Sequence, residues 1–183
     1  MGAKPPDFDS LAIATPRLLL VPSTPSLLNL ELIDKAAFSA LLGASLPEDW
    51  PPGDYDRDAA QFFLEKLVQG GTAVAGWYGW YVIQPATLSG PAVLIGNGGY
   101  LGPPDEAGSV EIGYSVCGRW RGQGLAKELV AALVDNAIRR GARKIVAHTS
   151  PENTASVGVL TSCGFLPVVS PDPLLLQFEY SPS

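Results

Sequence analysis

The feature that constrains the fold most is an amphipathic helix pattern between two strand patterns. Over Gly124 to Arg140, apolar residues recur at the spacing of one helix face, and Gly141 supplies a stop signal. Two arginines in the last turn complement the partial negative charge of a helix C-terminus. Strand-like runs stand on either side, at Ser109 to Val116 and Lys144 to Thr149. The centre of the chain is therefore predicted to be mixed α/β.

The flanking sequence predicts further strands and helices around this centre. Strands are expected at Arg17 to Val21, Trp77 to Ile83, Ala92 to Leu101 and Leu174 to Tyr180. Helices are expected within Pro25 to Gly43 with Asp34 as an N-cap, at Asp58 to Gln69, and at Asn153 to Cys163. The consecutive strand patterns between Trp77 and Val116 predict neighbouring antiparallel strands. A length of 183 residues suits one domain, which we place at residues 15–180 after a leader at 1–14.

Charge, cysteine usage and hydropathy exclude several classes of protein. The 18 acidic residues outnumber the 12 basic ones, and the resulting net charge of -6 argues against nucleic-acid binding and would attract a cationic partner. The alternative, which the charge alone favours, is that it only keeps the protein soluble. Cys117 and Cys163 lack the close spacing of a zinc or redox site, so no metal is expected. The absence of a signal-peptide pattern and of a membrane-length apolar run favours a soluble cytoplasmic protein without a membrane partner.

An arginine- and glycine-rich segment, Arg119 to Ala126, joins the central strand pattern to the central helix pattern. The free N–H groups and the dipole of a helix N-terminus attract anions at such a position. Gly122 and Gly124 would let the backbone approach phosphate oxygens, while Arg119 or Arg121 could add charge-assisted hydrogen bonds. The segment fits neither the Walker nor the Rossmann pattern. It predicts a pyrophosphate site, with an ordinary strand-to-helix turn as the alternative.

This segment resembles the hallmark of the GNAT acyltransferase superfamily, Arg/Gln-x-x-Gly-x-Gly/Ala, at Arg119, Gly122 and Gly124. Neighbouring segments agree with that resemblance. Thr15 to Leu20 is similar to the first strand of the branch that includes ribosomal-protein N-terminal acetyltransferases, and Val110 to Val116 is similar to the fourth strand of the superfamily. Asn153-Thr154-Ala155-Ser156, Val159-Leu160 and Gly164-Phe165 are together similar to its second conserved motif. The resemblance spans Thr15 to about Tyr180.

The resemblance implies an α/β (α+β) domain whose mostly antiparallel central sheet splays between its fourth and fifth strands, with helices on both faces. It also implies acetyl-CoA as the cosubstrate, with the Val116 backbone along the pantetheine arm. The cofactor-binding residues that follow are Val116, Arg119, Arg121, Gly122, Gln123, Gly124, Leu125, Ala126 and Asn153. One departure is visible, because Leu160 occupies the position where many members carry a tyrosine general acid.

Acetyl transfer to an amine needs a group that accepts a proton from the amine. Strand alternation places Glu111 on the opposite face from Val110 and Ile112, so its carboxylate could reach a cleft. An exposed strand carboxylate or an ion-pair partner is the alternative, and the resemblance favours catalysis. It also implies that Asn153 helps to organise the cofactor or the acceptor. His148, the single histidine, is a secondary candidate base.

A covalent acyl-enzyme is not supported, because Ser150 and Ser156 lack a nucleophile-elbow pattern and Cys117 is more simply a buried thiol. We therefore expect an N-acetyltransferase that uses direct attack in a ternary complex. Its acceptor is expected to be a small amine or a protein N-terminus, and its assembly a monomer or homodimer. A non-catalytic acyl-CoA-binding sensor and an acyltransferase for longer acyl-CoA molecules are the alternatives.

Overall fold

The computed structural model describes residues 11–182, so residues 1–10 of the expected leader lie outside the described part. The described residues form an eight-stranded sheet with the order β1-β2-β3-β4-β5-β6-β8-β7. Its strands are β1 (Ile13–Ala14), β2 (Leu19–Pro22), β3 (Gly79–Gln84), β4 (Val93–Tyr100), β5 (Ser109–Val116), β6 (Lys144–Thr149), β7 (Leu166–Val168) and β8 (Leu176–Tyr180). Because β1 pairs with β2, the sheet begins two residues before the expected boundary at residue 15.

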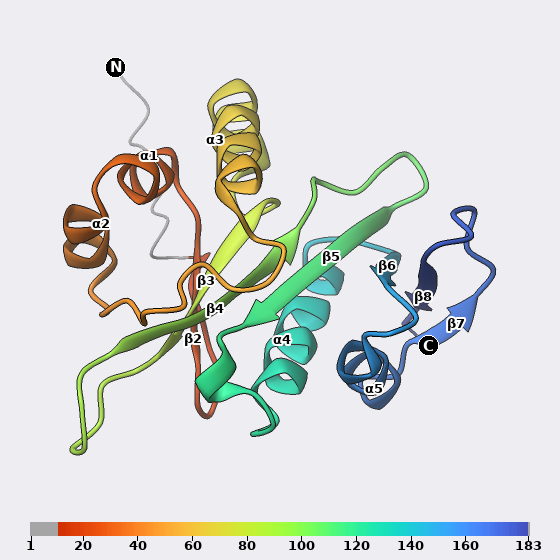
Figure 1. Ribbon diagram of the computed structural model, residues 1–183. Helices are drawn as coiled ribbons and strands as arrows, with labels where there is room; N and C mark the ends of the chain where they lie inside the picture. The colour runs from red at the N-terminus through yellow and green to blue at the C-terminus, as the bar shows by residue number, and fades with distance from the viewer. Residues whose placement is uncertain (1–10, 183) are drawn as a thin grey trace.

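The helices lie on both faces of this sheet, as the resemblance implies (Figure 1). On one face are α1 (Pro25–Ile33), α2 (Lys35–Leu42) and α3 (Arg57–Gly70), and on the other are α4 (Leu125–Arg139) and α5 (Thr154–Ser162). Two tyrosines mark the two faces. Tyr81 of β3 donates a hydrogen bond to Glu31 of α1, whereas Tyr100 of β4 donates to the Leu133 carbonyl of α4. The fold class is confirmed as a mixed α/β domain.

Most of the expected elements are present, with small differences at their ends. Asp34 caps α2 as expected, because its carboxylate accepts from the N–H groups of Ala36 and Ala37. The expected start of the next helix at Asp58 is wrong, since Asp56 is the N-cap of α3 and accepts from the Ala59 N–H. Strand β7 was not expected. Its three residues are exposed and include a proline, so they carry no alternating pattern.

The pairing of β5 with β6 gives the sheet its open end. Among the described strands, only β5 and β6 run parallel, and their register ends at Ile112 and Ala147. On its other side, β5 stays paired with β4 as far as Val116. The last four residues of β5 therefore have no recorded partner on β6, and the two strands diverge from there (Figure 1). This divergence confirms the expected splay between the fourth and fifth predicted strands.

Candidate active site

The segment 119–126, hereafter the glycine loop, connects the open end of β5 to α4. A short 3-10 turn at Gly118–Trp120 follows β5, and then Gly122 and Gly124 take left-handed backbone conformations with φ of 72° and 76°. Residues other than glycine are strained in this region. Gly124 is the N-cap of α4 and supplies no side-chain cap. Within residues 11–182, the backbone N–H groups of residues 122–127 have no recorded acceptor. The loop thus presents donors to an anion.

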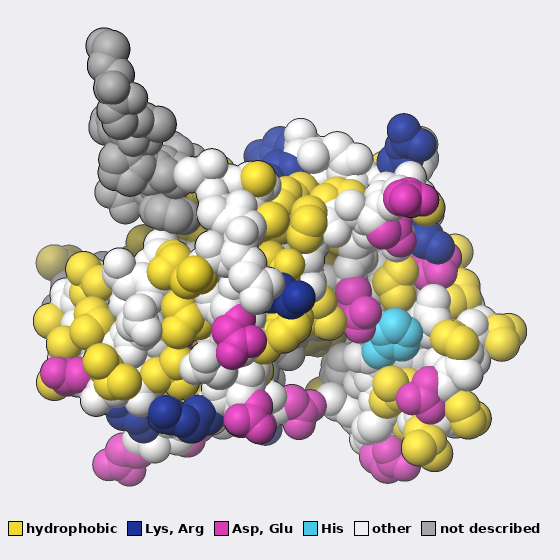
Figure 2. Space-filling model, turned by 90° about the horizontal axis from the view of Figure 1, so that it is seen from above, with side chains coloured by type: hydrophobic (Ala, Val, Ile, Leu, Met, Phe, Trp, Pro, Cys, Tyr) yellow, Lys and Arg dark blue, Asp and Glu magenta, His cyan; other side chains and the backbone are white. Residues whose placement is uncertain are grey.

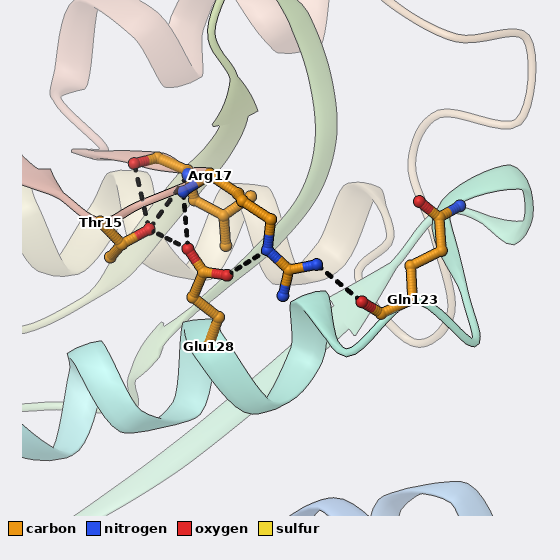
Figure 3. A network of polar contacts seen from close by, with 5 residues as sticks. Thr15, Arg17, Gln123 and Glu128 are labelled. Atoms are coloured by element: carbon orange, nitrogen blue, oxygen red, sulfur yellow. Dashed lines mark hydrogen bonds and ion pairs between the residues drawn. The ribbon is translucent and has the colours of Figure 1, made fainter.

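The turn between β1 and β2 holds this loop from the outside (Figure 3). The Arg17 guanidinium donates from Nε to Glu128 Oε2 at 2.6 Å and from Nη1 to the Gln123 carbonyl at 2.8 Å. The Arg17 backbone N–H and the Thr15 hydroxyl both donate to Glu128 Oε1, at 2.8 and 2.6 Å. Because the Gln123 carbonyl is held in this way, the peptide group between Gln123 and Gly124 cannot rotate freely.

The charge state of Glu128 fits this arrangement. Burial acts to raise the pKa of Glu128, but the hydrogen bonds from Thr15 and Arg17 outweigh burial and lower the pKa below its usual value. Glu128 is therefore a carboxylate at neutral pH and keeps Arg17 beside the loop. The sequence places Arg17 in a strand pattern and gives no sign of this contact, because more than 100 residues separate the partners.

The two arginines of the loop have different contacts. Arg121 folds back, and its Nε donates to the Val116 carbonyl at 2.8 Å. Arg119 lies with its guanidinium 5.5 Å from the Trp120 ring centroid, and its carbonyl accepts from the Gln123 amide at 3.0 Å. The backbone of Val116 is expected to meet the pantetheine arm, but its carbonyl already accepts a hydrogen bond from Arg121.

On the α1–α3 face of the sheet, Glu111 belongs to a set of polar side chains, hereafter the polar cluster. Glu111 Oε1 lies 2.8 Å from His148 Nδ1, and His148 Nε2 lies 3.3 Å from Gln177 Oε1. The Gln177 amide and Lys144 Nζ both donate to Glu179 Oε1, at 3.1 and 3.2 Å. The structure therefore brings together the two candidate bases. Gln177 and Glu179 were missed, because only the β6–β8 register places them beside β6. Lys144 of β6 was missed because its role depends on the contact with Glu179.

Next to the polar cluster, the surface of β5 is not covered by other atoms at Gly113. A Cβ atom added to Gly113 would meet no atom within 4 Å, although Gly113 lies between Glu111 and Ser115 on the same face of β5. A Cβ atom on Gly53 would collide with the Ser115 hydroxyl, so the loop before α3 packs closely against the end of β5. Figure 2 shows the single histidine, His148, at the edge of a hollow with acidic side chains on both sides.

A half-buried carboxylate, Glu31 of α1, joins three aromatic side chains on the α1–α3 face of the sheet. It accepts hydrogen bonds from Trp50 Nε1 at 3.0 Å, the Tyr55 hydroxyl at 2.7 Å and the Tyr81 hydroxyl at 2.6 Å. These four residues form the Glu31 cluster. Burial raises the pKa of Glu31, and the three hydrogen bonds oppose that rise only in part. Sequence patterns did not indicate this role, since the three partners lie 19, 24 and 50 residues away and reach Glu31 only through tertiary packing.

The geometry therefore combines a glycine-rich loop at the N-terminus of α4, a splayed sheet and the Glu111 carboxylate beside the empty space at Gly113. A sequence profile described as an acetyltransferase (GNAT) domain matches residues 17–166. The chain belongs to the GNAT acetyltransferase family. An N-acetyltransferase of Bacillus subtilis (strain 168), YjdG, described as uncharacterized, is 29% identical over 126 residues, which cover 68% of this chain and 71% of that protein.

Solved structures agree with this GNAT assignment. RimL, a ribosomal L7/L12 alpha-N-protein acetyltransferase in complex with coenzyme A, superimposes with a TM-score of 0.64 at 17% identity, covering 93% of this chain and 97% of that chain. The ribosomal-protein-S5-alanine acetyltransferase of Vibrio fischeri has a TM-score of 0.64 at 14% identity, with coverage of 93% and 96%. At such identities the likeness shows the fold. No helix within residues 11–182 has the length and apolar character needed to cross a membrane.

Other expected residues of this GNAT domain have structural surroundings that bear on their roles. Asn153 is the N-cap of α5, and its Oδ1 accepts from the Ser156 N–H at 3.1 Å. Among the described residues, no recorded hydrogen bond joins the Asn153 side chain to Glu111 or to the glycine loop. Leu160 is fully buried in the core. One turn earlier on α5, the Ser156 hydroxyl lies 2.9 Å from the Tyr114 hydroxyl of β5.

Proposed function

We propose that this GNAT domain transfers an acetyl group from acetyl-CoA to a primary amine by direct attack in a ternary complex. The observation that carries the proposal is the set of N–H groups at residues 122–127, which have no recorded acceptor among residues 11–182; residues 122–124 of this set are exposed, after the splayed end of β5. The acceptor is a small amine or a protein N-terminus. RimL and the Vibrio fischeri protein, whose names specify ribosomal proteins, support an amine acceptor of this kind.

The donor set of the glycine loop fits a pyrophosphate. Backbone N–H groups at a helix N-terminus bind anions without needing a particular side chain. The hallmark also fits a second alignment at Arg121, Gly124 and Ala126, and this alignment places its last position in the first turn of α4. When bound, acetyl-CoA supplies the thioester. The backbone N–H groups of the glycine loop would hold its phosphates. The pantetheine arm would lie beside the residues of β5 that lack a β6 partner.

Glu111 is placed to accept the proton of the amine. Its carboxylate lies on the same face of β5 as Gly113, where an added Cβ atom would meet no other atom within 4 Å. An amine can therefore approach Glu111 without displacing a side chain. A carboxylate in this position removes one proton directly or through water, which leaves the nitrogen lone pair free to attack the carbonyl carbon. Asn153 contributes by fixing the start of α5 beside the open end of the sheet.

Direct attack is favoured over an acyl-cysteine intermediate by the state of Cys117. Burial, together with the nearby Asp49 carboxylate, raises the pKa of Cys117 to about 11. The side chain is therefore a thiol at neutral pH, and a thiol is a poor nucleophile.

Tyr114 is our candidate for protonating the departing thiolate, because Leu160 has no proton to give. Burial raises the pKa of Tyr114 while the hydrogen bond with Ser156 lowers it in part, so the phenol stays protonated at neutral pH. The Tyr114→Phe variant should lose about tenfold to a hundredfold in kcat with unchanged affinity for acetyl-CoA. Steady-state kinetics and calorimetry measure the two quantities, and an unchanged kcat would remove Tyr114 from the mechanism.

Calorimetric titration with acetyl-CoA tests the cofactor assignment. Gly124→Val introduces a β-branched residue at φ 76°, whereas Gly141→Val introduces the same strain at φ 96° at the other end of α4, where a Cβ meets no atom within 4 Å. Each variant should lose about 1–2 kcal/mol of stability. Only Gly124→Val should weaken acetyl-CoA binding, by at least about tenfold.

Two results would contradict the proposal in different ways. Wild-type protein that binds no acetyl-CoA would remove its basis. Wild-type protein that binds acetyl-CoA but acetylates none of a panel of small amines and N-terminal peptides would favour the acyl-CoA sensor. Tighter binding of a longer acyl-CoA than of acetyl-CoA would instead move the assignment to another acyl donor.

A further inference from the structure

The hydrogen bonds of the polar cluster determine how Gln177 is oriented. The Gln177 Nε2 atom donates to Glu179 Oε1, and Lys144 Nζ donates to the same oxygen. With its NH₂ group used in this way, Gln177 presents its carbonyl oxygen to His148 Nε2 at 3.3 Å. A carbonyl oxygen can only accept, so the contact requires a proton on Nε2.

The other ring nitrogen of His148 also faces an acceptor. Its Nδ1 lies 2.8 Å from Glu111 Oε1, and an ionised carboxylate can only accept. A neutral imidazole carries one N–H group, so it satisfies one of the two contacts, whereas an imidazolium satisfies both. The same two contacts are satisfied if the imidazole is neutral and Glu111 is protonated. In either case, Glu111 and His148 together hold one proton more than a free carboxylate and a neutral ring.

We propose that His148 is a positioning residue that shares this proton with Glu111 and holds the Glu111 carboxylate in place as the base. The inference rests on the proposed acetyl transfer. The charged groups that face the pair are Lys144 of β6 and Glu179 of β8, and they form an ion pair with each other at 3.2 Å.

The proton balance of the step is simple. The pair first loses its shared proton to solvent, which both side chains reach, since Glu111 is 39% and His148 25% exposed. One N–H bond of the protonated amine then breaks as Glu111 accepts the proton, and the freed nitrogen lone pair forms the C–N bond. The C–S bond of the thioester breaks with its electron pair on sulfur, the nitrogen releases its second proton to solvent, and Tyr114 gives a proton to the departing thiolate. A proton on Glu111 next to His148 Nδ1 restores the arrangement in which both ring nitrogens donate. Gln177 and Glu111 therefore stabilise the pair after it has taken the proton.

This arrangement predicts the pH dependence of kcat/KM. The rate should rise with pH as the pair loses its shared proton. In His148→Gln the carboxylate acts alone, and a glutamate titrates about two pH units below an imidazole in unstructured peptides. The acid limb should therefore move to lower pH by about two units, and the plateau should fall about tenfold or more because the remaining base is weaker. A histidine that only filled space would leave the acid limb where it is.

The single histidine of the chain makes a direct measurement possible. In ¹⁵N-labelled full-length protein, the two ring-nitrogen resonances belong to His148 alone and report its protonation. Glu111→Gln should move the midpoint of that titration to lower pH by about one unit or more, since it removes the neighbouring anion. Gln177→Leu should move it in the same direction, and Gln69→Leu, an exposed site on α3, should not move it.

The two measurements separate the inference from the proposed function. A His148 titration that is unchanged in Glu111→Gln overturns the shared proton, whether or not the protein acetylates amines. Amine acetylation by His148→Gln with an unmoved acid limb also overturns it, and leaves the proposed function intact. A shifted titration in a protein that transfers no acetyl group would retain the shared proton and reject its role as base.

Discussion

The glycine loop and the Glu31 cluster border the same end of β5 but are built in opposite ways. The glycine loop is eight consecutive residues whose useful groups are backbone N–H donors at the surface. The Glu31 cluster joins side chains from α1, from the loop before α3 and from β3, and its half-buried carboxylate accepts from three buried aromatic side chains. The glycine loop therefore depends on backbone conformation, whereas the Glu31 cluster depends on tertiary packing. Damage to the first should reduce binding, and damage to the second should reduce stability.

The largest effect is expected from Glu31→Ala. The change leaves Trp50 Nε1 and the hydroxyls of Tyr55 and Tyr81 without their acceptor, and buried donors without partners cost about 1–3 kcal/mol each. We expect a loss of about 3 kcal/mol or more in the free energy of unfolding, measured by urea denaturation. Exposed Glu65→Ala is the control and should change it by less than about 0.5 kcal/mol. Equal losses in the two variants would contradict a stabilising role for the Glu31 cluster.

The same cluster predicts how stability depends on pH. Because burial raises the pKa of Glu31 above its ordinary 4.5, folding favours the protonated form. The contribution of Glu31 is fully present below pH 4.5 and is lost as the pH rises through the raised pKa in the folded state. Denaturation of Glu31→Gln at the same series of pH values should lack this decline. A decline that persists in Glu31→Gln would assign it to other groups.

A smaller effect, on binding rather than stability, is expected from Arg17→Gln. The change removes the hold on the Gln123 carbonyl and the ion pair with Glu128, so acetyl-CoA affinity should fall about tenfold. Because Arg17 is half exposed, the stability loss should stay below about 1 kcal/mol. Arg57→Gln removes a similar arginine-to-carbonyl bond on α3 and should change neither property. Calorimetry combined with Glu128→Gln in a double-mutant cycle would show whether the two side chains act together.

The sequence predicted the parts of this molecule that depend on local pattern. The central strand, helix and strand lie within a residue of their expected ends, and the two bases expected from the sequence, Glu111 and His148, are in contact. The missed residues share a different property. Arg17, Glu31 and Gln177 act through partners fixed by strand register or helix packing, and neither propensity nor periodicity encodes those distances. The short edge strand β7 was missed because an exposed three-residue segment shows no alternation.

The contact of Arg17 with Glu128 joins residues 111 positions apart, and this separation bears on the order in which the protein matures. Contacts across long stretches of chain form late, since the loop between them must be closed first. The N-terminal turn leaves the ribosome long before α4 and must wait for it. During synthesis or refolding, acetyl-CoA binding should therefore appear after the secondary structure has formed, when Arg17 first contacts Glu128.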